Sequence, residues 1–347
     1  MTPLALLLLV LPSTLSAKAP SSEALAHFRR GVQAYEGARF DEGIEELGRA
    51  IELYPGWKTA AAFRAMCLWT SGDARGARAD AELGLRLRPN GGESFTARGL
   101  ARFVNKDLDG ALADFREAVR RQPRYALGHF GVGSVMSSLG RSAEALTHLD
   151  RAAKLAPRAA VVYIVRGTVL DRLKRYPEAI ADYGRVLDLS PEFRWARYYR
   201  GRDHREMKEY SAAVEDFSAF LQAYPDHKEA LYARGNVHFL LGNYADAVRD
   251  LDRVVALDPK DGLAYANRGQ ARQRAGDRSG ALADLQRAKA LSPGKSAAIQ
   301  SAIDALAAAP DAEDEGERRS GEPSGIAAQA ELPEAAPAPR SEAERTP

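Results

Sequence analysis

The sequence is poor in the residues that build disulfides, metal sites and catalytic centres. Cys67 is the only cysteine among 347 residues, so no internal disulfide can form. A lone cysteine on a helix behaves as a small apolar residue, and we expect Cys67 to be buried, with a reactive thiol as the alternative. The six histidines include no pair at helical i, i+4 spacing, and the chain has neither a phosphate-binding glycine loop nor a nucleophile motif. We therefore expect a protein that is not an enzyme and that needs no cofactor.

Long apolar runs are also absent after the first residues, which predicts no membrane span in the mature chain. The run 4–11 is too short to cross a bilayer, and small residues follow it up to Ala17. This pattern is typical of a secretory signal peptide over 1–17, although no lysine or arginine precedes the run. An uncleaved anchor or a misplaced start codon is the alternative. We expect a secreted or periplasmic protein, and the abundance of alanine, arginine and glycine favours a bacterial source.

Eight prolines recur at a constant step of 34 residues. They are Pro55, Pro89, Pro123, Pro157, Pro191, Pro225, Pro259 and Pro293. A period in this range marks a solenoid of stacked structural units. With the proline at position 32, position 8 is glycine or alanine in every unit, position 20 is also small, and position 24 is large and apolar in all units except the second.

Each unit shows two stretches with helical apolar spacing, separated by a short polar turn near position 15. Glycine at this turn, as at Gly140, Gly242 and Gly276, suits a left-handed residue at a helix end. Pro177 falls where the second helix of its unit begins, a place that tolerates proline. The proline at position 32 disfavours helix at the preceding residue, so the second helix is expected to end there.

These columns resemble the tetratricopeptide repeat, and the resemblance covers most of the chain. It implies an all-α, right-handed superhelical solenoid of eight helix-turn-helix units over 24–295, which start at 24, 58, 92, 126, 160, 194, 228 and 262. A short linker, 18–23, precedes the units. The stretch 296–308 carries Ile299, Ile303 and Leu306 on one face and is predicted to be a capping helix.

The remaining segment, 309–347, is rich in proline, alanine and glutamate and has no aromatic residue. It contains ten acidic and four basic residues, a net charge of −6. Such a composition cannot bury enough apolar surface to fold, so we expect a disordered tail. A plain solvated tail is the simpler reading, and transient contact with a basic groove is the alternative.

Position 7 is arginine in seven of the eight units, and position 23 is acidic in the same seven units. A row of arginines can indicate nucleic-acid binding. Here the two columns lie at equal distances from the turn, and unit four breaks both together with Val132 and His148. We therefore predict structural ion pairs and no nucleic-acid partner. The regular pairs are Arg98–Asp114, Arg166–Asp182, Arg200–Asp216, Arg234–Asp250 and Arg268–Asp284.

In the family that the sequence resembles, the first helix of each unit lines a concave groove that binds protein or peptide segments. The resemblance implies an interaction scaffold, and the alternative is a glycan-binding or enzyme-associated accessory protein of the cell envelope. Packing between units is the other role open to the aromatic residues among the groove candidates. These candidates are Phe28, Tyr35, Phe63, Met66, Trp69, Phe103, Trp195, Tyr198, Arg202, Arg205, Tyr232, Asn236 and Asn267.

Two narrower sites are also suggested within this groove. Chaperone-binding members of the family hold a C-terminal carboxylate with two asparagines and three basic residues. Asn236 and Asn267 match the asparagines, but Tyr232 replaces the first lysine, so the clamp is incomplete. His204 and His238 share position 11 of adjacent units, which raises a two-histidine metal site as an alternative to ordinary packing.

Overall fold

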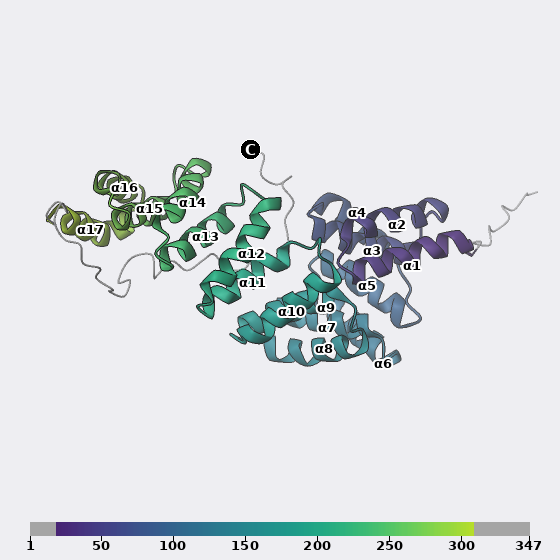
Figure 1. Cartoon of the computed structure of the whole chain (residues 1–347). Helices are drawn as coiled ribbons and strands as arrows, with labels where there is room; N and C mark the ends of the chain where they lie inside the picture. Colours follow the sequence, from purple (N-terminus) through teal and green to yellow (C-terminus); the bar gives the residue numbers. More distant parts are fainter. Residues whose placement is uncertain (1–18, 309–347) are drawn as a thin grey trace, which may run out of the picture.

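The computed structural model describes residues 19–308, and within that range the chain forms helices and connecting loops without a strand (Figure 1). The predicted signal peptide and the acidic tail lie outside the described residues. The first eight helices are α1 (Ser22–Glu36), α2 (Phe40–Leu53), α3 (Lys58–Ser71), α4 (Ala74–Leu85), α5 (Gly92–Val104), α6 (Leu108–Arg121), α7 (Ala126–Ser138) and α8 (Ser142–Leu155). The others are α9 (Ala160–Arg172), α10 (Tyr176–Leu189), α11 (Trp195–Glu206), α12 (Tyr210–Ala223), α13 (Lys228–Leu240), α14 (Tyr244–Leu257), α15 (Gly262–Arg274), α16 (Arg278–Leu291), the short 3₁₀ helix η1 (Pro293–Lys295) and α17 (Ser296–Ala308).

The predicted all-α solenoid is confirmed: the helices form eight antiparallel pairs, each followed by the next pair along the stack. The second helix of a pair ends two residues before the repeated proline in seven units. The second unit differs, since α4 ends at Leu85, four residues before Pro89. α1 begins at Ser22, inside the segment predicted as linker, and Ser21 caps it by accepting a hydrogen bond from the Ala24 amide at 3.1 Å.

The turn inside every pair contains one residue with left-handed backbone at position 15. Four of these residues are glycines, with φ between 74° and 90°. The other four are Ala38, Lys106, Lys174 and Lys208, with φ between 57° and 63°. A residue with a Cβ is strained in this conformation, so the geometry of the turn is imposed by the packing of the two helices.

The small residue at position 8 makes room for the large one at position 24. A Cβ added to Gly31 would lie 2.5 Å from Leu47 Cγ, and one added to Gly167 would lie 2.8 Å from Tyr183 Cε1. In the second unit both positions are alanine, so the exception at Ala81 is matched by the methyl group of Ala65 across the pair. The paired helices can thus approach closely because the residues at positions 8 and 24 are complementary in size.

The arginine and acidic columns meet across each pair. Arg166, for example, donates from Nε and Nη2 to the two carboxylate oxygens of Asp182 at 2.7 and 2.6 Å. The shortest N–O distances are 2.6–2.8 Å for Arg64–Asp80, Arg98–Asp114, Arg166–Asp182, Arg200–Asp216, Arg234–Asp250 and Arg268–Asp284. In the first unit Glu46 accepts from both Arg30 and His27. The arginines are therefore committed to intramolecular pairs.

Unit four, which lacks the ion pair, joins its helices with two histidines. The Nδ1 atoms of His129 and His148 lie 3.3 Å apart, and His129 Nε2 lies 3.0 Å from the carbonyl oxygen of Pro123. Burial, followed by the neighbouring His129, lowers the pKa of His148. Val132 is fully buried in the space that an arginine stem occupies elsewhere.

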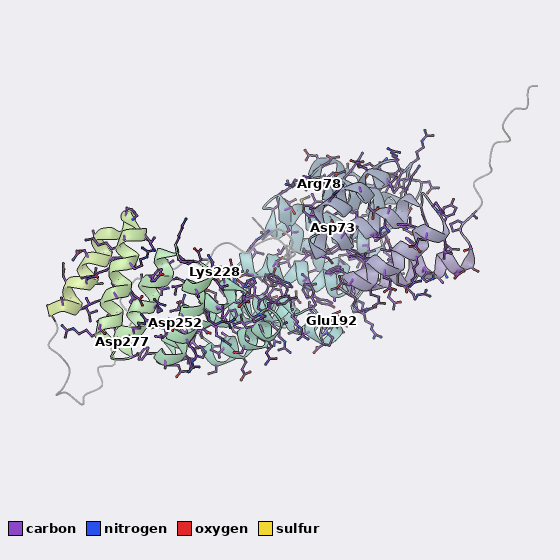
Figure 2. The ribbon with its side chains drawn as sticks, turned by 90° about the horizontal axis from the view of Figure 1, so that it is seen from above. Asp73, Arg78, Glu192, Lys228, Asp252 and Asp277 are labelled. Atoms are coloured by element: carbon purple, nitrogen blue, oxygen red, sulfur yellow. The ribbon has the colours of Figure 1, made fainter. Side chains whose placement is uncertain are left out.

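The stack divides into two regions with different curvature. Helices α1 to α10, which we call the ring, curl so far that α1 contacts α9 (Figure 1). The ring is held closed by the first turn: Ser190 Oγ donates to the carbonyl oxygen of Gly37, and the rings of Phe40 and Phe193 meet edge to face at 6.1 Å. Helices α11 to α17, the arm, extend away from the ring, as the positions of Asp73 and Arg78 relative to Asp252 and Asp277 show (Figure 2).

The free end of the arm is covered by α17. This helix buries Ile299 and Leu306 against Ala281, Leu285 and Ala288 of α16, where a further repeat would otherwise stack. Cys67 lies in the core of the ring with no exposed surface, and burial raises the pKa of its thiol. None of the helices within 19–308 combines the length and apolar character that crossing a bilayer requires.

Candidate functional site

The inner face of the ring forms an open cavity of about 430 Å³. The first helices of the five pairs of the ring contribute to its wall, and so does α11, the first helix of the arm. The apolar part of the wall includes Met66, Trp69, Leu100, Phe103, Leu108, Phe130, Val161, Ile164 and Val165. A cavity of this size and polarity is typical of a ligand site.

Four of the predicted groove residues line this cavity, namely Tyr35, Met66, Trp69 and Phe103. Met66, Trp69 and Phe103 are half-buried, so part of each side chain faces the cavity. Phe28 and Phe63 do not line it. Phe28 stacks on Trp57 with ring centroids 4.7 Å apart, and Phe63 has no exposed surface. Both are core residues between the first two units, as the packing alternative proposed.

Two hydroxyl groups in the cavity wall are buried without a hydrogen-bond partner. They are the phenol of Tyr35, a residue that is only 1% exposed, and Oγ of Ser134. Burial raises the pKa of Tyr35. A buried hydroxyl without a partner costs about 1–3 kcal/mol. Neither hydroxyl has surface open to the cavity, so both belong to the packing behind its wall.

The cavity wall contains three charged side chains, Lys106, Asp171 and Arg172. Arg172 is fixed across the inner face, since Nη1 donates to the carbonyl oxygen of Ser137 at 2.9 Å and lies 3.0 Å from its Oγ. Lys106 occupies the left-handed turn position and is exposed. Two cations therefore accompany one carboxyl group where the cavity opens to solvent.

Asp171 interacts with a second carboxyl group, Asp203, at the junction of α9 and α11. Asp203 is 1% exposed, and burial, with Asp171 as the next cause, raises its pKa to about 9. The Tyr183 hydroxyl, Asp203 Oδ2 and Arg202 Nε are all buried without a hydrogen-bond partner. This polar junction thus holds a protonated Asp203 at neutral pH directly behind the cavity wall.

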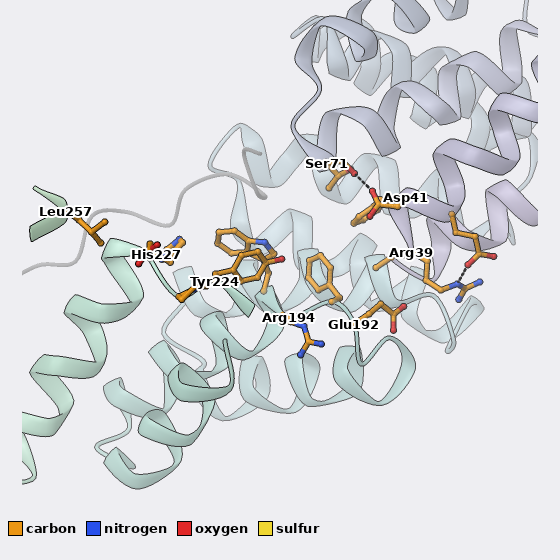
Figure 3. A pocket seen from close by; sticks show the side chains of 16 residues that line it. Arg39, Asp41, Ser71, Glu192, Arg194, Tyr224, His227 and Leu257 are labelled. Carbon is orange, nitrogen blue, oxygen red and sulfur yellow. Dashed lines mark hydrogen bonds and ion pairs between the residues drawn. The ribbon is translucent and has the colours of Figure 1, made fainter. Parts of the chain in front are cut away.

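A second cleft of about 880 Å³ lies where the ring meets the arm (Figure 3). It contains Arg39, Asp41 and Ser71 from the first units and Arg194 and Tyr224 from the sixth. Its charged groups are partly paired, since Arg39 donates to Glu42 at 2.6 Å. The predicted groove residue Trp195 lies at this cleft and packs on Phe220, with ring centroids 5.2 Å apart. Tyr198 is 9% exposed and belongs to the same aromatic cluster.

The remaining candidates in the arm are engaged with each other. Asn267 Nδ2 donates to the Tyr232 hydroxyl and to Asn236 Oδ1, the latter at 3.3 Å, which links α15 to α13. Asn267 is 2% exposed and its Oδ1 is buried without a partner. The two asparagines that resemble a carboxylate clamp are therefore largely occupied in holding adjacent units together.

The two arginines among the groove candidates, Arg202 and Arg205, both have acidic neighbours. Arg205 pairs with the adjacent Glu206, and Arg202 lies beside the buried Asp203. His204 contacts Glu209 at 2.6 Å, while burial lowers the pKa of His238. Among residues 19–308, no three His, Cys, Asp or Glu side chains gather closely enough to hold a metal ion.

The cavity itself was missed by the sequence analysis. The repeat columns identify which helices face inward, but ring closure depends on contacts between residues about 95 to 155 positions apart, such as Tyr35 with Phe130 and Gly37 with Ser190. The only sequence signal was the cluster of bulky apolar residues on the inner face of the first three units. Ser134, Arg172 and Asp171 have no repeated counterpart that would single them out.

A family model of the tetratricopeptide repeat matches the chain over residues 64–126, 96–157, 137–192, 198–261 and 241–296. No curated protein matches it significantly. Among solved structures, YrrB, described as a tetratricopeptide repeat protein with an unusual peptide-binding site, has 22% identity and a TM-score of 0.51 over 54% of this chain and 97% of its own. The Cut9–Hcn1 structure has 14% identity and a TM-score of 0.60 over 81% of this chain and 55% of its own. The pilF structure of Pseudomonas aeruginosa has 19% identity and a TM-score of 0.51 over 65% of this chain and 99% of its own.

Proposed function

Because the chain belongs to the tetratricopeptide repeat family, whose members generally mediate protein–protein interactions, we propose that it is a scaffold that binds a protein segment on the inner face of its ring. The observation that carries this proposal is the cavity of about 430 Å³ on the inner face, with a mostly apolar wall that also contains Lys106 and Arg172. The family is typically non-enzymatic, which fits a binding role. The peptide-binding site described for YrrB, whose fold is similar, also supports a peptide ligand.

We place this function in the bacterial cell envelope. The support is the sequence pattern of 1–17, which resembles a signal peptide with cleavage after Ala17. The mature protein is expected to begin at Lys18. N-terminal sequencing of protein from the periplasm or the medium tests this, and recovery of intact chain starting at Met1 in the cytosol would reject the location.

The binding role can be tested by photo-crosslinking in cells that produce the full chain. A photoreactive residue at Phe103 faces the cavity, whereas one at Arg120, whose side chain is 70% exposed on α6, faces away from it. We expect a discrete protein adduct from position 103 and none from position 120. Adducts at equal levels from both positions would contradict a specific inner-face site.

Glycan binding in the envelope is the alternative role, because rows of aromatic side chains also stack on sugars. The structure gives no specific support for it, since Tyr198 and Tyr232 are only 9% and 8% exposed. The crosslinking experiment distinguishes the two: a glycan adduct at position 103 that is lost on glycosidase treatment would replace the scaffold proposal.

A further inference from the structure

The cavity of the ring offers a ligand two kinds of surface, an apolar wall and two cations. Its volume of about 430 Å³ lies within the range of sites for small molecules. Lys106 and Arg172 are exposed and line the cavity where it opens to solvent. The apolar residues of the wall that are half-buried, and so present part of their surface, include Met66, Trp69, Phe103, Leu108, Ile164 and Val165.

Three hydroxyl groups of the wall are already bonded within their own helices. Thr70, Ser138 and Thr168 each donate to the carbonyl oxygen of an earlier residue in the same helix, the latter two at 3.1 and 2.8 Å. A ligand that needs one of these hydrogens has to break a bond inside the protein, which costs free energy. The wall therefore favours a chain that carries no polar groups along its length.

The cations at the opening lack acidic partners. Neither Arg172 nor Lys106 forms an ion pair with a carboxylate among residues 19–308. The single carboxyl group of the wall, Asp171, is engaged with a second carboxyl group behind it. Arg172 bonds to Ser137 through Nη1 only, which leaves Nε and Nη2 for a ligand. A guanidinium group with two such donors pairs well with a carboxylate.

We infer that the cavity of the ring binds a straight-chain carboxylate, with its hydrocarbon chain along the apolar wall and its carboxylate at Arg172 and Lys106. Burial of the chain supplies the affinity, and the ion pair sets its direction. The inference goes beyond the proposed scaffold function, because it gives the ring a small ligand besides a protein segment. The two ligands share one wall, so the carboxylate competes with the segment.

Tryptophan fluorescence can locate the chain, because the three tryptophans lie in different surroundings. Trp69 lies in the cavity wall, Trp195 lies at the cleft between ring and arm, and Trp57 stacks on Phe28. Dodecanoate brominated at the end of its chain quenches a tryptophan that it contacts. We expect quenching in the full chain and in Trp195→Phe, and loss of most of it in Trp69→Phe. Calorimetric titration with dodecanoate should show that Trp69→Phe still binds the chain.

The same titration tests the charge at the opening. Arg172→Gln should weaken the binding of dodecanoate about threefold, within the range for an exposed ion pair, and leave the binding of neutral dodecanol unchanged. Arg274→Gln is the matched control. Arg274 occupies position 13 of unit eight, as Arg172 does in unit five, and is also exposed, but it does not line the cavity. Its replacement should leave the affinity for dodecanoate unchanged.

Several results would overturn the inference. Quenching that is lost in Trp195→Phe but kept in Trp69→Phe would place the chain in the other cleft. An equal loss of affinity in Arg172→Gln and Arg274→Gln would show that the carboxylate has no specific site. Binding to phosphatidylglycerol vesicles without binding of dodecanoate would identify a membrane surface as the ligand.

The proposed scaffold function fails or stands separately. A protein adduct at position 103 without binding of dodecanoate would overturn this inference and leave the scaffold function standing. Quenching at Trp69 without any protein adduct would support this inference and count against a protein partner on the inner face.

Discussion

The ring and the arm are built from the same 34-residue unit, yet one encloses its inner face and the other leaves it open. Most anchors within each pair are shared: glycine at position 8, alanine at position 20 and the arginine–aspartate pair occur in both regions, and the exceptions lie in units one, two and four of the ring. The most extensive contact between successive first helices lies in the ring, between α3 and α5, whereas α7 and α9 of the ring contact each other no more than α13 and α15 of the arm do. In the ring, α3 packs closely on α5 because Gly84, Ala62 and Ala101 meet there, and a Cβ on Gly84 would lie 2.7 Å from that of Ala101.

The comparison shows that the anchors determine the unit, whereas the contacts between units determine the superhelix. In the arm, α13 and α15 are separated by the hydrogen-bonded side chains of Tyr232, Asn236 and Asn267, which are larger than the alanines of α3 and α5. At these two places, small residues allow an extensive contact between units, and larger polar residues keep the first helices apart.

If the anchors stabilise both regions equally, breaking the ion pair of one unit should lower the free energy of unfolding by a similar amount in the ring and in the arm. Asp182 in the ring and Asp250 in the arm have side chains that are both 6% exposed, and their arginines are 22% and 21% exposed. Replacement of either aspartate by alanine should lower the free energy of unfolding by about 3–5 kcal/mol, because a half-buried guanidinium loses its buried carboxylate. Arg166 keeps Asp150 at 3.0 Å and Arg234 keeps only Ser218 Oγ at 3.0 Å, so the loss at Asp182 should lie at the lower end of this range.

Urea unfolding of both variants, together with Arg166→Ala and the Arg166→Ala/Asp182→Ala double variant, measures this effect. The double-mutant cycle should show coupling between the two side chains. Strict additivity of the single changes, or a loss at Asp182 much larger than at Asp250, would break the comparison.

One glycine of the ring, Gly131, contributes to helix packing within the ring only, so its replacement should change the stability of the ring. A Cβ on Gly131 of α7 would collide with the ring of Phe115, so Gly131→Ala should destabilise the protein by about 1–3 kcal/mol through overpacking. Gly184→Ala is the control, since its Cβ meets nothing closer than Arg200 Nη1 at 3.7 Å. That change should stabilise α10 by up to about 1 kcal/mol. Equal effects of both changes in thermal unfolding would show that the packing of α7 on α6 does not depend on this contact.

The junction of the two regions should respond to pH through Asp203. Its pKa in the folded protein is about 9, above the ordinary value of 3.8, so the folded state holds a proton that the unfolded state releases. Stability from this group is complete below about pH 4 and is lost as the pH rises toward 9, by up to about 1.4 kcal/mol for each pH unit. Asp171 faces it from α9, Tyr183 from α10, and Arg202 and Glu206 from α11.

Asp203→Asn keeps the shape of the side chain and replaces the ionisable carboxyl group by an amide that does not titrate. Its melting temperature should change less between pH 5 and pH 8.5 than that of the unchanged protein. A parallel pH dependence in the two proteins would show that Asp203 does not carry the effect.

Most of the fold could be predicted because the same 34-residue pattern recurs along the chain. The candidate site could not be predicted, because it depends on contacts between residues that are far apart in the sequence. The proline column locates helix ends because proline constrains the residue before it, and the arginine and acidic columns face each other because they flank one turn at equal distances. In contrast, the contact of Phe40 with Phe193 joins units one and five and has no periodic signature. The half-buried Met66 and the core residue Phe63 share a helix and an apolar character, so only the fold separates them.

The left-handed residues at position 15 are also only partly predictable from the sequence. Changing them gives the smallest of the predicted effects on stability. Glycine at position 15 indicates left-handed backbone, but Lys174 adopts φ of 57° at the same position without any such sequence signal. Lys174 is exposed in the turn between α9 and α10, so its replacement by glycine relieves backbone strain without removing a buried contact. Since the strain relieved is about 1–2 kcal/mol and glycine adds unfolded-state entropy, we expect Lys174→Gly to stabilise the protein by about 0.5–1 kcal/mol. Gly242→Lys, the reverse change in the arm at φ of 77°, should destabilise by a similar amount in the same urea titration. Loss of stability in Lys174→Gly would show that the lysine side chain contributes more than its backbone costs.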